Sequence, residues 1–554
     1  MRLPVEVSRP VAPMMLEQVS FFDRFNSLPE AVQSQIEDTY GVYRNDLMPV
    51  LIKNIDKLKA VFEGEGKEER FFHPSDNALI SMGMMFILQV RDHASIDEIL
   101  MRMNTDVAYQ YVLFSTSNSV KPLISRSYYT LFRKKLAEYD ARHDSCLMAT
   151  IFSDFTDVAA SEMGINLHQD LGDELRTRID SMLIDTPAEH LTRAGIIYRT
   201  NAMCLDLVAS LNGLVVIPED LQHYLDDSDE NAVVYHNKEG KMDKLTWLLN
   251  DSLRIKSLLE GYQDFEEYGL VCRVITEQGI LAEDGTISPK PDQKIEGSSM
   301  QSPLYPSGTC RKKYGFQIGD AVCFTEASRS DLSASLLTEV LYGKNIISDD
   351  EFMMEHLRRK DPNGPIEVCS CDAGFFSMAT VKAAVEAGVI LIPSDLKGSL
   401  PKPLMAGFTM ADDSQSVLTC PKGHAPIDGS QKYNPETNSV SAKFDKATCE
   451  ACPFFGECPV KAQAKACKVE VSQLRIDLAE QVCAIDSRIF QEYANYRNAI
   501  ESVPSVMRRT YGFDSLHSMN VSLRKEMIFA ASINYNCKKL NAFRKNRDSV
   551  KKAA

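Results

Sequence analysis

The sequence predicts an α/β protein in which a mixed sheet follows an all-helical domain, and two observations carry this prediction. From about residue 71 the chain shows three helical patterns, separated by polar or Pro-containing breaks: "DNALISMGMMFILQV", "SIDEILMRMNTDVAYQYVLF" and "SRSYYTLFRKKLAEYDARH". Beyond residue 175, short segments typical of strands alternate with helical ones. That order of elements builds a sheet with helices packed on it.

The chain is long and acidic. Its 554 residues allow for about two to four domains, and its formal net charge is −16. The longest apolar stretch, residues 78–90, is too short to cross a bilayer, and the N-terminus lacks the apolar run of a signal peptide. Most of the fourteen cysteines are isolated, as is typical of reduced core thiols. We therefore expect a cytoplasmic protein that contacts no membrane.

The helical region, residues 71–165, follows an N-terminal segment, residues 1–70. Its three helices resemble a helix-turn-helix arrangement, which presents its recognition helix to DNA. In that arrangement four bases of the last helix would face phosphates: Arg126, Arg133, Lys134 and Lys135. The alternative, that they form an ordinary solvated helix face, stays open.

The sheet is predicted from five strands and one long insertion. The first strand is "RTRIDSMLIDT", residues 176–186, and a mostly helical insertion at residues 205–300 follows it. This insertion is acidic, since residues 219–267 hold thirteen acids against five bases. Next, "KKYGFQIGDAVCFTEA" and "SLLTEVLYGK" form a hairpin, and "IEVCSC" and "VILIPS" are strands on either side of a helix.

Three carboxylates occupy positions at which an α/β sheet builds a site. Asp180 lies within the first strand, Asp372 ends the fourth, and Glu501 shares a helix face with Arg497, four residues before it. A few convergent carboxylates suffice to hold a pair of magnesium ions on a phosphodiester. Each acid alone also fits an ordinary structural role, and Asp185 fits the first position as well as Asp180 does.

Several motifs together resemble the DDE transposases of bacterial insertion sequences, in the group with an N-terminal helical domain and a cysteine-bearing insertion. The resemblance runs from about residue 70 to 540 and rests on "RIDSMLIDT", "MQSPLYPSGTCRKKYG", "CDAGFFS" and "RNAIESVPSVMRR". The most specific part is the spacing of Arg497, Glu501 and Arg508, which is similar to the family's Tyr-x2-Arg-x3-Glu-x6-Lys signature.

The chain departs from that signature twice. Ala494 stands at the Tyr position, with Tyr493 and Tyr496 beside it, and Arg508 replaces the final Lys. On a helix Arg508 falls two turns beyond Glu501, where it can contact a phosphate near the metals.

The resemblance implies an RNase H-like catalytic domain at residues 166–510, in which Asp180, Asp372 and Glu501 bind two Mg²⁺ (or Mn²⁺) ions. It implies an enzyme that binds the ends of its element in double-stranded DNA, hydrolyses phosphodiester bonds and transfers the 3′ ends to target DNA, as a homodimer. The DNA contacts it implies within this domain come from four bases: Arg311, Lys312, Arg497 and Arg508. Two alternatives stay open, a catalytically silent DNA-binding descendant and a plain RNase H-like nuclease.

A cysteine cluster marks a second insertion, residues 412–470. Cys449, Cys452 and Cys458 form a C-x2-C-x5-C run, with Cys420 and His424 upstream. Thiolates at such spacing favour a closed tetrahedral zinc site, and we expect Cys420 as the fourth ligand. An iron-sulfur cluster and a metal-free reading are the alternatives.

The C-terminus is basic. Residues 505–554 carry eleven Lys and Arg against three acids, a local balance of +8. We expect residues 511–554 to form a tail that contacts phosphates without regard to sequence.

Overall fold

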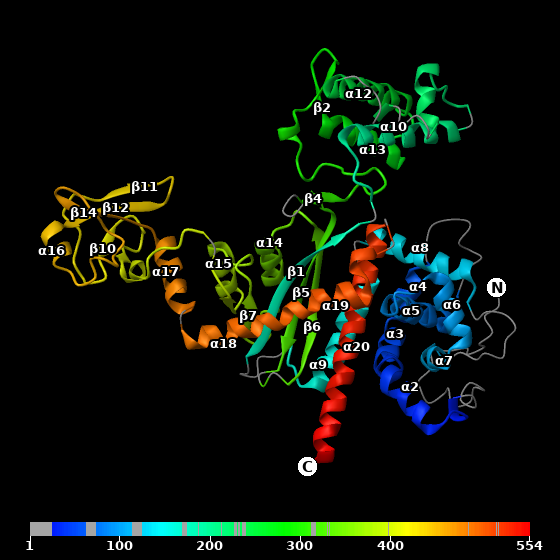
Figure 1. The fold of residues 1–554 in the computed structure, drawn as a ribbon, viewed down its shortest axis with the longest axis horizontal. Coiled ribbons are helices and arrows are strands. Elements are labelled where there is room, and N and C mark those ends of the chain that lie inside the picture. Colours follow the sequence, from blue (N-terminus) through cyan, green and yellow to red (C-terminus); the bar gives the residue numbers. More distant parts are fainter. Residues whose placement is uncertain are drawn as a thin grey trace.

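The computed structural model is elongated, with a cysteine-containing subdomain at one end, a central sheet, and the N-terminal helices at the other end (Figure 1). Within the described part of the chain, no helix combines the length and apolarity of a membrane span. The structure describes the following residues: 25–62, 74–113, 124–143, 145–168, 174–186, 188–211, 213–226, 230, 233–234, 240–311, 317–329, 331, 333–396, 398–485, 487–516, 518 and 520–553.

The N-terminal helices form one bundle. The elements are α2 (Glu30–Val42), η2 (Tyr43–Leu47), α3 (Met48–Lys53), α4 (Ile55–Ala60), α5 (Asp76–Arg91), α6 (Ile96–Thr105), α7 (Val107–Leu113), α8 (Arg126–His143) and α9 (Leu147–Met163). Helix α5 is buried along most of its length, and Gly83 leaves room for Leu51 and Leu58 of the preceding helices. Residues 30–60 therefore pack into the same core as the helices after residue 71, where we had predicted a separate segment.

The central sheet has the order β4-β5-β1-β7-β8, with β6 on the free edge of β5. Its strands are β1 (Leu175–Asp185), β4 (Thr309–Arg311), β5 (Gln317–Ser328), β6 (Ser335–Lys344), β7 (Glu367–Cys371) and β8 (Val389–Pro393). Strand β1 runs antiparallel to β5 and parallel to β7, which is parallel to β8. This mixed topology confirms the predicted α/β class and is compatible with an RNase H-like fold.

Alternation along β1 divides its side chains between two cores. Ile179 packs with residues of α14 (Asp349–Arg359) and α15 (Met378–Glu386) on one face. Met182 and Ile184 belong to the large core on the other face, which α9 and the C-terminal helix complete. Asp180 shares the second face, because its side chain alternates with that of Ile179.

Between β1 and β4 the chain forms a helical subdomain with its own core. Its elements are α10 (Arg193–Ser210), η4 (Glu219–Leu225), α12 (Lys241–Leu258), α13 (Glu266–Gln278), β2 (Gly279–Leu281), β3 (Ile287–Pro289) and η6 (Asp292–Lys294). The subdomain lies beyond one end of the central strands in Figure 1.

After β8 the chain enters the cysteine subdomain, which we define as residues 409–471. Its main sheet has the order β11-β12-β14-β13. The helix η7 (Pro403–Gly407) precedes it, and its elements are β9 (Thr409–Met410), β10 (Val417–Thr419), β11 (Lys432–Asn434), β12 (Ser439–Asp445), α16 (Lys446–Glu450), β13 (Lys461–Ala462) and β14 (Ala466–Val471). The return to the central sheet runs through α17 (Gln473–Ile485), α18 (Arg488–Arg497), η8 (Asn498–Glu501), α19 (Ser502–Tyr511) and η9 (Phe513–Ser515).

The expected basic tail, residues 511–554, is instead largely α20 (Val521–Ala553), a long helix packed between the N-terminal bundle and the sheet (Figure 1). Arg524 is fully buried and pairs with Asp320 of β5. Further along, Arg544 forms ion pairs with Asp46 and Glu162. Acids distant in sequence thus neutralise much of the charge that we had assigned to phosphate.

Candidate active site

Asp180 and Asp372 come together through strand register. In the parallel pairing of β1 with β7, Arg178 stands opposite Ser370. Two residues further, the same register carries Asp180 alongside Asp372, which directly follows β7. Ser394 Oγ lies 3.3 Å from Asp372 Oδ1 and donates to it.

Glu501 is connected to Asp180 through Arg497. Nη1 of Arg497 donates to Glu501 Oε1 at 3.1 Å, and Nη2 lies 4.0 Å from Asp180 Oδ1. The Arg497 side chain is 13% exposed, whereas that of Glu501 is 62% exposed. The guanidinium therefore lies between the first and third predicted carboxylates, with Glu501 on the solvent side.

Two tyrosines hold α18, which carries Arg497, on the sheet. The hydroxyl of Tyr496 donates to Ser328 Oγ at 2.8 Å, and that of Tyr493 donates to Glu174 Oε1 at 2.6 Å. Ser370 Oγ in turn donates to the carbonyl of Tyr493 at 2.9 Å. Sequence reasoning noted both tyrosines only as neighbours of the motif position, whereas the structure gives them an anchoring role.

Arg178 is a further anchor that sequence reasoning missed. It forms a buried ion pair with Glu326 of β5, and its guanidinium lies 4.7 Å from the ring centre of Tyr496. Nη1 of Arg178 also donates to the Tyr496 carbonyl at 3.2 Å. Its position two residues before Asp180 was the available signal, since residues i and i+2 of a strand lie on one face.

The site concentrates negative charge. Burial raises the pKa of Asp180 to about 6, and the neighbouring carboxylates of Asp372 and Asp349 raise it as well. The positive charge of Arg497 and a hydrogen bond from the Ser181 N–H act in the opposite direction. A cation placed among these carboxylates would relieve their repulsion.

Two further acids on or near β1 have distinct positions. Asp349, which we had not singled out, begins α14 and accepts a hydrogen bond of 2.6 Å from Ser181 Oγ. Asp185 is exposed at the end of β1, paired with Gly319, and lies five residues beyond Asp180. The structure thus brings Asp180, and not Asp185, into the group of carboxylates.

Residues 419–541 match the family model described as a transposase DDE domain. Over these residues the chain resembles the DDE transposases. The match includes Arg497, Glu501 and most of the cysteine subdomain, and it supports a transposase-type function with DNA as partner. No curated protein and no solved structure matches the chain.

Within the matched segment, Arg508 of α19 lies close to β1. Its Nη2 donates to the carbonyl of Leu183 at 3.3 Å, and its Nε lies 3.2 Å from Asp514 Oδ1. Its side chain is 45% exposed. Arg311 lies in β4, and its side chain and the whole of Lys312 lie outside the described residues.

The four bases predicted in α8 differ in exposure. Arg126 and Lys134 are exposed and lie 3.1 and 3.8 Å from Asp97 and Glu138 respectively. Lys135 is largely covered and lies 3.1 Å from Glu138, while Arg133 is partly buried. Their contact with DNA stays a prediction.

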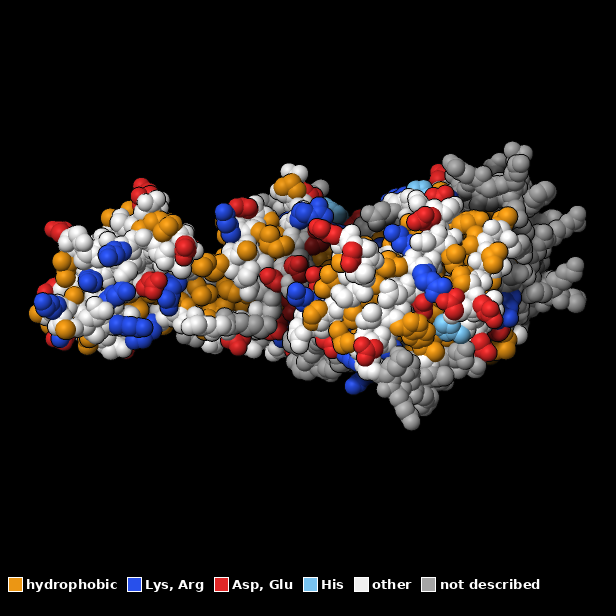
Figure 2. Space-filling view, turned by 90° about the horizontal axis from the view of Figure 1, so that it is seen from above, with side chains coloured by type: hydrophobic (Ala, Val, Ile, Leu, Met, Phe, Trp, Pro, Cys, Tyr) orange, Lys and Arg blue, Asp and Glu red, His pale blue; other side chains and the backbone are white. Residues whose placement is uncertain are grey.

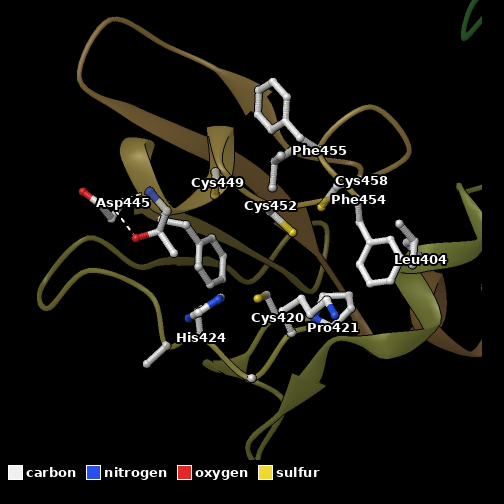
Figure 3. A pocket seen from close by; sticks show the side chains of 16 residues that line it. Leu404, Cys420, Pro421, His424, Asp445, Cys449, Cys452, Phe454, Phe455 and Cys458 are labelled. Carbon is white, nitrogen blue, oxygen red and sulfur yellow. Dashed lines mark hydrogen bonds between the residues drawn. The ribbon is translucent and has the colours of Figure 1, made fainter.

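The four predicted zinc ligands gather around one pocket of the cysteine subdomain. Cys420, Cys449, Cys452 and Cys458 all line it, together with His424. Figure 3 shows the sulfurs of Cys420, Cys452 and Cys458 directed into this pocket. A soft donor set of this kind suits zinc.

A fifth thiol lies beside this cluster. Cys467 of β14 is fully buried and hydrogen-bonds with Cys449, whose pKa is raised to about 12 by burial and then by that neighbour. Cys458 also interacts with Cys420 and Cys452. No three of these sulfurs lie within 4.8 Å of one another. Among the described residues, the two groups of three ligand atoms that meet this distance are made of other residues.

The first of those groups centres on His356. Its Nδ1 lies 2.6 Å from Glu339 Oε2 and its Nε2 lies 3.0 Å from Glu367 Oε1. Burial alone would lower the pKa of His356, but the carboxylates of Glu367 and Glu339 raise it well above its ordinary value. Both ring nitrogens are thus engaged by carboxylates, which is typical of a buried ion pair and not of a metal ligand.

Proposed function

We propose that this protein is a metal-dependent DNA transposase, which cleaves phosphodiester bonds at the ends of its element and joins the 3′ ends to target DNA. The observation that carries the proposal is the convergence of Asp180 and Asp372 through strand register, with Arg497 connecting Asp180 to Glu501. The family match over residues 419–541 supports the same class of reaction.

The carboxylates fit a pair of hard divalent cations. Asp180, Asp372 and Glu501 supply oxygen ligands, which Mg²⁺ and Mn²⁺ prefer. Two such ions would polarise the scissile phosphate and activate both the attacking and the leaving oxygen. Asp180 and Asp372 are fixed by the sheet, whereas Glu501 is exposed and can approach when a cation is present.

Other side chains of this chain position the substrate. Arg508 is partly exposed on the β1 side of α19, where it can contact a phosphate next to the carboxylates. We propose that Arg311 and Lys312, together with Arg126 and Lys134 of α8, contribute further contacts to duplex DNA. Pairing of two DNA ends favours a homodimer.

We also propose that the cysteine subdomain holds one structural zinc ion through Cys420, Cys449, Cys452 and Cys458. The shared pocket and the soft sulfur donors support this assignment. Binding of the ion would draw the sulfurs together and stabilise a part of the chain that has a small core of its own.

Carboxamide substitution tests the proposed reaction. Purified protein is incubated with Mg²⁺ and DNA that bears the repeats flanking its gene, and cleavage and strand-transfer products are resolved on gels. Asp180→Asn, Asp372→Asn and Glu501→Gln should each reduce cleavage by about a thousandfold or more, while duplex affinity stays near that of the wild type. Combining two should cost little more than one, because the three act as a unit.

Asp185→Asn is the matched control and should stay active, because Asp185 is exposed at the end of β1 and apart from the carboxylate group. If all four variants cut DNA as the wild type does, the enzyme proposal is wrong and a silent DNA-binding descendant replaces it. Cleavage without strand transfer would instead identify a plain nuclease.

A further inference from the structure

Strand register in the cysteine subdomain places three lysines in a row. Lys443 of β12 stands directly opposite Lys468 of β14, and Lys468 stands directly opposite Lys461 of β13. Neighbouring strands lie about 4.8 Å apart, so the row crosses the sheet over roughly 10 Å. Lys432 of the fourth strand, β11, pairs with Ser441 and lies on the same face.

This lysine row points away from the core of the subdomain. Val440, Ala442 and Phe444 of β12 are buried in that core, so the alternate position, Lys443, lies on the opposite face. Lys443 and Lys461 are exposed, and Lys468 between them is half-buried. Figure 2 shows Lys and Arg side chains gathered over this end of the molecule.

Like charges directly opposite each other weaken a sheet. None of its lysines forms an ion pair with a described carboxylate, unlike Arg544 and Lys539 of α20. Two acids, Glu470 and Asp445, lie on this face, but neither forms an ion pair with a lysine of the row. Glu470 accepts from Ser439 Oγ at 2.9 Å, and Asp445 accepts from the N–H of Thr448 at 2.8 Å.

We propose that the row of Lys443, Lys468 and Lys461 is a docking surface for the phosphate backbone of double-stranded DNA. Lysines in a row, none of them ion-paired with a described carboxylate, match a polyanion of regular charge spacing, and a duplex carries one charge per ~1.7 Å of its axis. The contact is independent of sequence, because lysines bound to phosphate position a duplex without reading its bases.

The location of the row gives it a role in the proposed reaction, on which this inference rests. Helices α17 and α18 connect the cysteine subdomain to Arg497 and Glu501 along the chain. It lies at the opposite end of the molecule from the N-terminal helices (Figure 1). A duplex bound to the lysine row therefore contacts the protein at a second site, far from α8.

The test measures duplex affinity of the full-length protein as a function of salt, by fluorescence anisotropy with a labelled duplex of unrelated sequence. The triple variant Lys443→Gln, Lys461→Gln, Lys468→Gln should bind about a hundredfold more weakly at 0.1 M salt and flatten the slope of log K against log[salt] by about 2 to 3. The matched control carries Lys294→Gln, Lys344→Gln and Lys382→Gln, which remove the same charge from exposed sites elsewhere.

An unchanged slope in the triple variant overturns the docking surface, and so does an equal loss in the control, which would reflect net charge alone. Loss of single-stranded RNA binding with duplex binding intact also overturns it. If wild-type protein binds no duplex at all, the proposed function is wrong as well. If the triple variant binds and cleaves duplex as the wild type does, only the proposed docking surface is wrong. Thermal melting checks folding, and single Lys→Gln variants, each expected to change the slope by about 0.9, replace the triple variant if it melts early.

Discussion

Arg497 Nη2 lies 4.0 Å from Oδ1 of Asp180, although α18 and β1, which carry these two residues, lie far apart along the chain. The same guanidinium donates to Glu501 at 3.1 Å, and its Nε is buried without a hydrogen-bond partner among the described residues. A single cation of the chain thus neutralises two of the three acids proposed to bind metal.

Replacing Arg497 should separate metal affinity from catalysis. In Arg497→Gln the carboxylates lose a competing positive charge, so Mg²⁺ should bind roughly fivefold more tightly, as expected for an interaction of about 1 kcal/mol. Cleavage should nevertheless fall, because Glu501 is no longer held toward Asp180. Isothermal calorimetry with Mg²⁺ and a cleavage assay measure the two effects.

Arg488→Gln serves as the control for that experiment. Arg488 is almost fully exposed on the same helix and pairs with Glu492 four residues on, so it copies the local ion pair without the contact to Asp180. Unchanged Mg²⁺ affinity in Arg497→Gln would show that the guanidinium does not compete with metal.

Arg524→Met should destabilise the whole protein. Arg524 is fully buried, pairs with Asp320 at 3.0 Å and donates to the Asp185 carbonyl at 3.2 Å. Its loss leaves Asp320 as a buried charge without its partner, which typically costs about 3–5 kcal/mol. Urea unfolding followed by circular dichroism measures the change, and Lys538→Met at an exposed position of the same helix should unfold as the wild type does.

Zinc removal should loosen the cysteine subdomain. Elemental analysis should find one zinc per chain, and Cys452→Ser should lose it together with local protection from hydrogen exchange in residues 409–471. Cys483→Ser is the control, since Cys483 is exposed on α17 and outside the pocket. Iron with visible absorbance, or no metal in the wild type, would contradict the assignment.

Glu526 should make stability depend on pH. Burial raises the pKa of Glu526 from 4.5 to about 7, against the opposing effect of hydrogen bonds from the N–H groups of Met148 and Leu147. The folded state therefore holds this proton more tightly than the unfolded state, and stability falls as pH rises from about 4.5 through 7.

Glu526→Gln removes that dependence. Its free energy of unfolding relative to the wild type should rise by up to about 3 kcal/mol between pH 4.5 and 8. At low pH the variant should be the less stable of the two, because an amide offers one acceptor oxygen where the carboxyl group serves two N–H groups. Parallel melting curves at all pH values would contradict the shifted pKa.

Local patterns predicted the elements of the central sheet and the position of Asp372 at the end of β7, because alternation and strand ends are properties of short segments. They also predicted that Arg497 and Glu501 share a helix face. The partners of Arg178 and Tyr496 were not predictable, since Glu326 and Ser328 lie on another strand.

The count of basic residues did not reveal the ion pairs of α20, because their partners are distant in sequence. A window of sequence shows Arg544 as basic but not that Asp46 and Glu162 face it. Conversely, the window around the cysteines is balanced in charge, and only strand register brings Lys443, Lys468 and Lys461 together.

The place of α20 also fixes when the protein can finish folding. The side chain of Asn534 accepts from the hydroxyl of Tyr43 and donates to the carbonyl of Ile87, so the last helix completes the bundle formed by the first ones. At synthesis rates of about 5–20 residues per second, roughly 20 to 100 seconds separate the emergence of these partners from the ribosome. A nascent chain therefore carries an open N-terminal core until α20 emerges, and a product that ends before α20 lacks the helix that completes the bundle.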